Sequence, residues 1–374
     1  MLNKQLHIIS FDVPLPADYG GVIDVYNRIR HLHALGIEIT LHCFTYGRKK
    51  NTDLNNFCKA VYYYPRSTSA LNILHREPFI VTTRNHPDLL TCLLADDHPI
   101  LFEGLHTTHF LSHPSIQNRI KMVRAHNIEH EYYRYLYNAE KNFFRKLYFL
   151  SESIKLKDYE KNLKYAQYIG SISSTDRNYF QKKWGHSFLL PPFHHFDEIK
   201  SKTGHGNYSL YHGNLGVAEN EKAAIWLVEK ISPLLNHPLI IAGSRCSTTL
   251  RNKISDSSNV TLIENPSDEK MEILISDAQV HLLPSFQESG IKLKLLHAIY
   301  SGRFVLVNSM MLSGTSLENA CAIANGIPDF AQKANSLFSL PFTNEEIEKR
   351  KKTLFKNYDN ESNAKMLIDQ IFNS

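Results

Sequence analysis

The sequence contains little cysteine and no long apolar run, and each absence excludes a class of protein. The five cysteines are odd in number and widely spaced, so neither a disulfide framework nor a zinc site is expected, and a reducing compartment fits best. No stretch of about 18 apolar residues occurs, so a transmembrane helix is not expected. The apolar run within residues 1–10 is also too short for the core of a signal peptide. We therefore expect a cytoplasmic protein.

Charge of one sign is not in large excess either. The formal net charge is +5 over 374 residues, and no recognisable nucleic-acid motif is present, so no nucleic-acid partner is expected. The charge is compatible with anionic small molecules or an acidic membrane surface. The 20 histidines are scattered without the spacing of a metal site, so we expect no metal and no cofactor.

What the sequence does contain is a regular alternation of short apolar runs and helical patterns. This alternation predicts parallel sheets covered on both faces. The predicted strands are residues 6–11, 37–44, 61–64, 100–102, 121–125, 209–212, 239–242, 260–263, 280–283 and 304–307. A polar linker at 201–207 separates two such patterns. We therefore predict an α/β protein with two Rossmann-like doubly wound domains, 1–195 and 196–345, facing a central cleft, and a last helical segment, 346–374.

The stretch 284–307 is the most informative part of the chain. It indicates strand, loop, helix and strand, with Gly290 in the loop and Lys292 and Lys294 in the first helical turn. A helix N-terminus with unpaired N–H groups and added lysines suits a phosphate or diphosphate, and a glycine lets the ligand come close to the backbone. Residues two apart do not share a helix face, so the two lysines should differ in role. The alternative is a pair of solvated lysines on an exposed helix.

Other candidates follow predicted strands, because ligands of open α/β sheets bind at the carboxyl ends of strands. Gly20 and Gly21 open the first helix, either as a tight turn or as a loop that packs against a ligand; the full dinucleotide fingerprint is missing. His126 comes at a strand end, where it would bind a sugar hydroxyl or move a proton unless it is purely structural. Glu103 with His106 is a weaker case of the same kind.

The second domain offers a similar set of loops. His212-Gly213-Asn214 suits a phosphate or sugar contact, or else forms a simple Gly-Asn turn. Gly243 and Glu264 end the next strands and would line a nucleotide pocket. A carboxylate such as Glu264 or Glu288 can accept two hydroxyls of a ribose or hexose.

Taken in order, these motifs resemble those of a known family. The chain resembles retaining glycosyltransferases of the GT-B fold (glycosyltransferase family 4-like), close to the large bacterial group that builds surface polysaccharides. The matching pieces are Gly20-Gly21, Arg124-Ala125-His126-Asn127-Ile128-Glu129, Ser173 with Asp176, His212-Gly213-Asn214 with Asn220, Ala242-Gly243, and residues 288–294.

The resemblance implies a transferase with a nucleotide-diphosphate sugar as donor and a glycan or lipid-linked acceptor. It implies that His126 approaches the transferred sugar and that Lys292 or Lys294 neutralises the leaving diphosphate. It also implies that the last helical segment, 346–374, crosses back to the first domain. The donor-binding residues it implies are His212, Gly213, Asn214, Gly243, Glu264, Glu288, Ser289 and Gly290. The acceptor-binding residues it implies are Gly20, Gly21, Glu103, His106, Arg124 and Asn127. One alternative is a nucleotide-sugar epimerase of the same fold. Family members often carry a glutamate where His297 stands, which leaves a second alternative, a non-catalytic sugar- or nucleotide-binding protein.

One segment raises the question of a membrane. Residues 141–164 hold several lysines beside apolar residues, and a basic amphipathic helix can lie on an anionic bilayer. The apolar residues are Phe143, Phe144, Leu147, Tyr148 and Leu150. The favoured alternative is that they fill the core of the first domain. Any contact with the inner membrane face is expected to be weak, peripheral and sensitive to salt.

Overall fold

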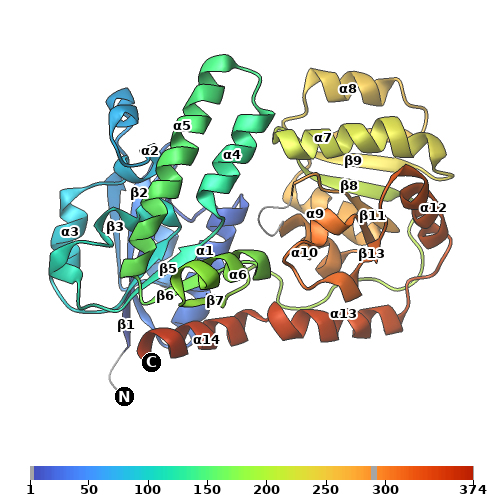
Figure 1. The fold of residues 1–374 in the computed structure, drawn as a ribbon. Coiled ribbons are helices and arrows are strands. Elements are labelled where there is room, and N and C mark those ends of the chain that lie inside the picture. The colour runs from blue at the N-terminus through green and yellow to red at the C-terminus, as the bar shows by residue number, and fades with distance from the viewer. Residues whose placement is uncertain (1–3, 288–292, 374) are drawn as a thin grey trace. The chain divides into compact units, whose positions relative to one another are not determined.

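The protein is an α/β protein in two compact units, as predicted (Figure 1). The structure is a computed structural model that describes residues 4–287 and 293–373. The first unit comprises Met1–His195 and Tyr358–Ser374, and the second comprises Phe196–Asn357. Each unit is built on its own sheet. None of the helices among the described residues is long and apolar enough to cross a membrane.

The first unit has a seven-stranded parallel sheet with the order β3-β2-β1-β4-β5-β6-β7. Its strands are β1 (Gln5–Ser10), β2 (Glu38–Thr45), β3 (Ala60–Pro65), β4 (Ile100–Glu103), β5 (Lys121–Ala125), β6 (Tyr168–Ser171) and β7 (Ser187–Leu189). Apolar clusters cover both faces of the sheet, as a parallel sheet requires. The strand order reverses at β1, which pairs with β2 on one side and β4 on the other. Ligands of doubly wound sheets bind at such a reversal.

Helices and short 3₁₀ turns connect these strands. The helices are α1 (Gly20–Ala34), α2 (Phe79–Thr82), α3 (Pro87–Leu93), α4 (Glu129–Ala139), α5 (Phe143–Tyr159), α6 (Ser174–Trp184) and α14 (Asn360–Phe372). The 3₁₀ turns are η1 (Thr52–Asn56), η2 (Ala70–Leu74), η3 (Leu105–Phe110), η4 (Pro114–Ile116) and η5 (Glu160–Tyr165). Figure 1 shows α4 and α5 lying side by side, with their connecting turn at the end away from the sheet.

The second unit has a six-stranded parallel sheet with the order β10-β9-β8-β11-β12-β13. Its strands are β8 (Ser209–Asn214), β9 (Leu239–Ser244), β10 (Val260–Glu264), β11 (Val280–Leu283), β12 (Phe304–Val307) and β13 (Ala322–Ile323). Its helical elements are α7 (Ala218–Trp226), η6 (Leu227–Ile231), η7 (Ser232–Leu234), α8 (Thr248–Ser255), α9 (Asp268–Asp277), α10 (Leu293–Ser301), α11 (Ser309–Leu312), η8 (Glu318–Ala320), α12 (Ile327–Phe338) and α13 (Asn344–Asn357). The strand order reverses at β8, between β9 and β11.

Two details of the chain path differ from the sequence-based expectation. The strands β6, β7 and β13 are present in addition to the ten predicted ones; they are short, between two and four residues, and carry little apolar pattern. The last segment returns to the first unit at Tyr358 rather than at residue 346. The reason is Arg350 of α13, which is buried in the second unit and donates to the carbonyls of Ile299 and Gly302 at 3.0 and 2.6 Å.

The expectation that the apolar residues of 141–164 fill the core is wrong for three of them. Phe143, Phe144 and Leu147 are exposed, whereas Tyr148 and Leu150 are half-buried. Helix α5 begins here because Asn142 has an extended conformation and its side chain accepts the N–H of Arg145.

Candidate functional site

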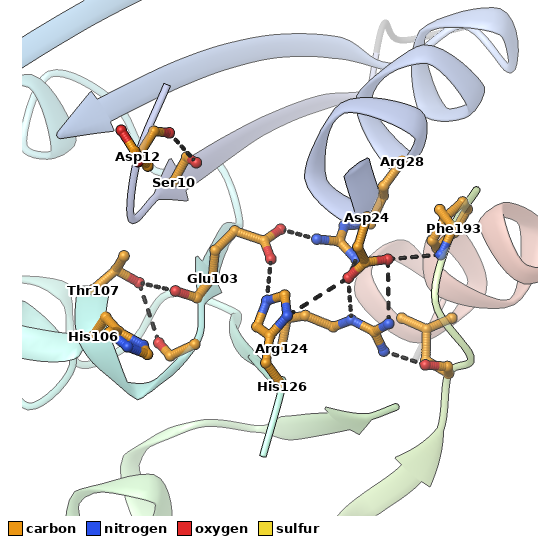
Figure 2. Close-up of polar contacts among 12 residues, drawn as sticks. Ser10, Asp12, Asp24, Arg28, Glu103, His106, Thr107, Arg124, His126 and Phe193 are labelled. Atoms are coloured by element: carbon orange, nitrogen blue, oxygen red, sulfur yellow. Dashed lines mark hydrogen bonds and ion pairs between the residues drawn. The ribbon is translucent and has the colours of Figure 1, made fainter. Parts of the chain in front are cut away.

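A buried network of charged side chains occupies the strand reversal of the first unit (Figure 2). Glu103 ends β4, Arg124 and His126 lie at the end of β5, and Asp24 and Arg28 come from α1. Sequence analysis named Glu103, Arg124 and His126, and the structure brings these three together. Asp24 and Arg28 were missed. The signal that would have found them is an acid and a base at spacing four inside the buried part of a helix.

Asp24 is the centre of this network. Its carboxylate accepts hydrogen bonds from Arg28 Nη1 and Arg124 Nε, both at 3.1 Å, and from the backbone N–H of Phe193 at 2.7 Å. Burial alone would raise the pKa of Asp24, but the guanidinium groups of Arg124 and Arg28 outweigh it and hold the pKa well below its usual range. Asp24 is therefore ionised at neutral pH.

Glu103 forms the second anionic partner. It is fully buried, and its carboxylate accepts a hydrogen bond from Arg28 and faces His126 Nε2 at 3.2 Å. His126 Nδ1 lies 3.9 Å from Asp24, and the side chain is 13% exposed. The imidazole is thus oriented by two carboxylates at the end of β5, where sequence analysis expected a functional histidine.

The same atoms raise the question of a metal ion. Ligand atoms of Asp24, Glu103 and His126 lie within 4.8 Å of one another. However, both carboxylates already pair with Arg28 or Arg124, so their charges are balanced by fixed cations. A divalent cation would have to displace these guanidinium contacts, and the donor set therefore suits ion pairing better than metal binding.

Arg124 has a different place from the one that the resemblance implies. It is fully buried and donates to the carbonyls of Leu190 and Pro191 as well as to Asp24. Its guanidinium therefore holds the chain after β7 against β5 and positions Asp24. Direct contact between the Arg124 side chain and an acceptor would require this packing to open.

The remaining acceptor candidates surround the network. Gly20 and Gly21 begin α1, whose N-terminus has no side-chain cap, and a Cβ on Gly21 would lie 2.8 Å from the Phe11 ring. His106 follows β4, and burial lowers its pKa well below the usual value. Its Nδ1 lies 4.0 Å from the carboxylate of Glu129 at the start of α4.

Glu129 was not predicted as a site residue beyond its place in a motif. It is 4% exposed, and its Oε1 has no hydrogen-bond partner among the described residues. Burial raises the pKa of Glu129 to about 8, and the nearby Asp176 adds to the effect, while Asn127 and Arg84 oppose it. Burial likewise raises the pKa of Asp176 to about 6. Glu129 is therefore predominantly protonated at neutral pH.

In the second unit, the strand reversal carries a lysine. Lys294 of α10 donates to Asn220 Oδ1 at 2.8 Å and to the Tyr211 hydroxyl at 3.1 Å. Asn220 in turn donates to the carbonyl of Asn214 at 2.9 Å, so the loop after β8 is tied to the lysine. The following helix, α7, has no side-chain cap at its N-terminus. The ammonium group and the uncapped N–H groups favour an anion, whereas Glu219 and Glu221 in the first turn of α7 oppose one.

Two predicted glycines make this loop possible. Gly213 has φ of +154°, and a Cβ there would lie 3.3 Å from the Asn220 amide. A Cβ on Gly243 would lie 1.8 Å from the carbonyl oxygen of Gly213, so only glycine lets β9 approach β8 at this point. Gly243 thus acts through packing of the loop.

His212 and Glu264 are placed less directly for a ligand. His212 is buried, with its ring 5.7 Å from that of His281 and 5.9 Å from that of His297, and burial lowers its pKa well below the usual value. Glu264 ends the edge strand β10 and forms a two-pronged ion pair with Arg251 at 2.8 and 2.9 Å. Glu288, Ser289, Gly290 and Lys292 lie outside the described residues.

His297, which stands where the family often has a glutamate, also has a defined contact. Its Nε2 lies 2.7 Å from the carboxylate of Glu272 on α9, and its ring packs against Phe196 at 4.9 Å. A carboxylate is therefore held close to this position, but it reaches there from a neighbouring helix.

Comparison with known proteins places this geometry in context. No model of a known protein family matches the chain. A protein of Klebsiella pneumoniae, described as an uncharacterized 44.6 kDa protein in the cps region, is 29% identical over 360 aligned residues, which cover 88% of this chain and 89% of that protein.

Solved structures with the same architecture cover nearly the whole chain. Sucrose-phosphate synthase from Thermosynechococcus elongatus has a TM-score of 0.72 at 14% identity, with 99% of each chain covered. A TarM variant from S. aureus in complex with fondaparinux, alpha-GlcNAc-glycerol and UDP has a TM-score of 0.66 at 11% identity. The match covers 99% of this chain and 100% of that one. Trehalose-6-phosphate synthase, solved in work on enzymatic glycosyltransfer with retention, has a TM-score of 0.64 at 12% identity, with 99% of each chain covered. The fold is that of the GT-B glycosyltransferases.

Proposed function

We propose that the protein is a glycosyltransferase of hexosyltransferase type that transfers a sugar from a nucleotide-diphosphate donor to a glycan or lipid-linked acceptor. We further propose that the anomeric configuration is retained and that the reaction serves surface polysaccharide synthesis. The fold and the described function of trehalose-6-phosphate synthase support the reaction type. The relative in a cps region supports the polysaccharide context.

The observation that carries the proposal is the position of Lys294. Its ammonium group lies at the carboxyl end of β8, beside an uncapped helix and a glycine loop. When the bond between the sugar and the diphosphate breaks, negative charge builds on the leaving phosphate. A fixed cation stabilises that charge more in the transition state than in the ground state. Lys292 is proposed to share this role on the strength of the sequence motif.

In a retaining transfer, the acceptor oxygen forms the new bond to the sugar carbon as the bond to the diphosphate breaks. The proton of the acceptor hydroxyl then passes to the leaving phosphate oxygen, so no separate carboxylate base is required. We assign His126 the task of contacting the transferred sugar. Glu103 and Asp24 keep its imidazole in one orientation, which lowers the entropic cost of that contact.

The test of the anion site compares a nucleoside diphosphate with the bare nucleoside. We expect Lys294→Ala to weaken diphosphate binding by about tenfold or more and to leave nucleoside binding nearly unchanged, because a charge-assisted contact is lost. Lys333→Ala, which removes an exposed lysine on α12, is the matched control. Equal loss for both ligands, or no loss, would refute the anion site.

The reaction is tested by incubation with a panel of nucleotide sugars, with and without glycan acceptors. Release of nucleoside diphosphate that depends on an acceptor, with a product of the same anomeric configuration as the donor, supports the proposal. A change in the donor sugar without any acceptor would instead identify an epimerase. Donor binding without turnover would identify a non-catalytic binding protein, the alternative suggested by His297 in place of the glutamate.

A further inference from the structure

Helix α5 presents an apolar stripe to solvent. Phe143, Leu147 and Ile154 follow one another at spacings of four and seven residues and therefore share one face of the helix. Their exposed fractions are 66%, 47% and 62%, and the neighbouring Phe144 is 78% exposed. The stripe runs for about 16 Å along the helix, at about 1.5 Å per residue. Exposed apolar groups are ordinarily scattered singly, and several of them gathered on one helix face mark an interaction surface.

The stripe cannot turn inward, because the opposite face of α5 is anchored in the first unit. Glu152 accepts the backbone N–H of Phe79 at 2.6 Å, and the Tyr159 hydroxyl donates to the carbonyl of Thr108 at 3.0 Å. Both side chains are buried. Exposure of the apolar stripe is therefore a fixed property of the folded unit.

A row of cations accompanies the stripe on the side of α4. The groove between α4 and α5 has a volume of about 410 Å³ and is lined by Arg134, Lys157 and Ile154 among others. Arg134 and Lys157 are exposed, and Ile154 belongs to both the groove and the stripe. Glu131 is the carboxylate in the lining, so the groove keeps an excess of one positive charge.

The turn that begins α5 carries further positive charge. Lys141 and Arg145 flank the exposed Phe143 and Phe144, and Arg145 pairs with Glu140 at 3.2 Å. Cations thus lie near both ends of the stripe, Lys141 and Arg145 beside Phe143 and Arg134 and Lys157 beside Ile154. An interfacial helix has this arrangement: its apolar face enters the acyl boundary while its cations meet anionic headgroups.

We propose that the outer face of α5, with the adjoining α4–α5 groove, docks the protein on an anionic membrane surface. Phe143, Phe144 and Leu147 enter the bilayer interface, and Arg134 and Lys157 bind lipid phosphates in the groove. This surface would bring the enzyme to acceptors that are themselves held in the membrane.

A second copy of the chain fits this surface less well. In a two-fold contact the same patch meets itself, so Arg134, Lys157 and Lys141 would approach their own equivalents. Like charges brought together in this way oppose association. An anionic bilayer accepts the apolar stripe and neutralises the flanking cations at the same time.

The test is co-sedimentation with vesicles of phosphatidylcholine, alone or with about a third of phosphatidylglycerol, at low and high salt. We expect the protein to bind the anionic vesicles at low salt and to release them at high salt. Phe143→Ser combined with Phe144→Ser should reduce the partition coefficient by about tenfold or more. Arg134→Gln combined with Lys157→Gln should reduce it by about fivefold per charge on anionic vesicles only.

The matched control is Phe355→Ser, which removes an equally exposed aromatic (74%) from α13 of the second unit and should bind as the unchanged protein does. No binding to anionic vesicles at low salt would overturn the proposal, as would equal loss in the control. A sedimentation coefficient that falls in the Phe143 and Phe144 variant, with vesicle binding unchanged, would show that a second copy covers the stripe. Vesicle binding needs no nucleotide sugar, so its failure would leave the proposed reaction standing.

Discussion

The buried carboxyl of Glu129 makes a quantitative prediction about stability and pH. Its pKa is raised from 4.5 to about 8 by burial, so the folded state keeps the proton that the unfolded state releases. The free energy of unfolding therefore falls as pH rises through this range. Between about pH 5 and about pH 7 the loss from this one group is about 2.5 kcal/mol, at about 1.4 kcal/mol per pKa unit. Glu129→Gln mimics the protonated form and should remove the loss.

The measurement is the free energy of unfolding of wild type and Glu129→Gln in urea at both pH values. The two tryptophans separate the units: Trp184 lies in the first and Trp226 in the second, so fluorescence in a Trp226→Phe background follows the unit that contains Glu129. Variant and wild type should have similar stability near pH 5. At neutral pH the variant should be more stable by about 2.5 kcal/mol.

Only the difference between the two proteins isolates Glu129, because other groups also titrate. Burial raises the pKa of Asp176 to about 6, so this group also lowers the stability of the protein as pH rises. Burial lowers the pKa of His106, so this group raises the stability of the protein as pH rises over the same range. A difference that is the same at both pH values would refute the reasoning. It would show that Glu129 is ionised, as its place at the N-terminus of α4 would favour.

Two further predictions concern the sites themselves. His126→Ala should lower kcat by about a hundredfold while donor affinity stays within about twofold, and His33→Ala, on the exposed side of α1, should change neither; a matching loss of donor affinity would contradict the assignment. Gly243→Ala should cost about 3 kcal/mol or more in urea unfolding followed by Trp226, because its Cβ meets a backbone carbonyl at 1.8 Å. Gly326→Ala, with φ of +80° and open space, should cost about 1 kcal/mol, and equal costs would refute the packing role of Gly243.

Much of the architecture follows from local pattern alone. Short apolar runs such as 239–242 and 280–283 in an α/β chain predict strands that are buried on both faces of a sheet. Glycine after a strand and before a helix then marks the end of the sheet where ligands bind. His126, Glu103, Gly213 and Lys294 could be chosen on this basis, because strand order and chain direction place strand ends together.

What local pattern could not predict is how charge is balanced inside the fold. Asp24 pairs with Arg124 across 100 residues of sequence, and Arg28 pairs with Glu103 across 75. These partners are known only when the three elements meet. The same holds for Arg124, whose residue type suits an acceptor but whose burial gives it a positioning role.

Sequence by itself thus determined the α/β class, the positions of ten strands and the strand ends that carry functional residues, because these depend on neighbours in the chain. Tertiary structure alone decided which side chains are buried and which face solvent. Phe143 and Phe144 are apolar as core residues are, yet both face solvent in the first turn of α5. Glutamate is ordinarily a surface residue, yet packing buries Glu129 and raises its pKa. Both outcomes depend on desolvation, which is a property of the whole surroundings of a group and not of its neighbours along the chain.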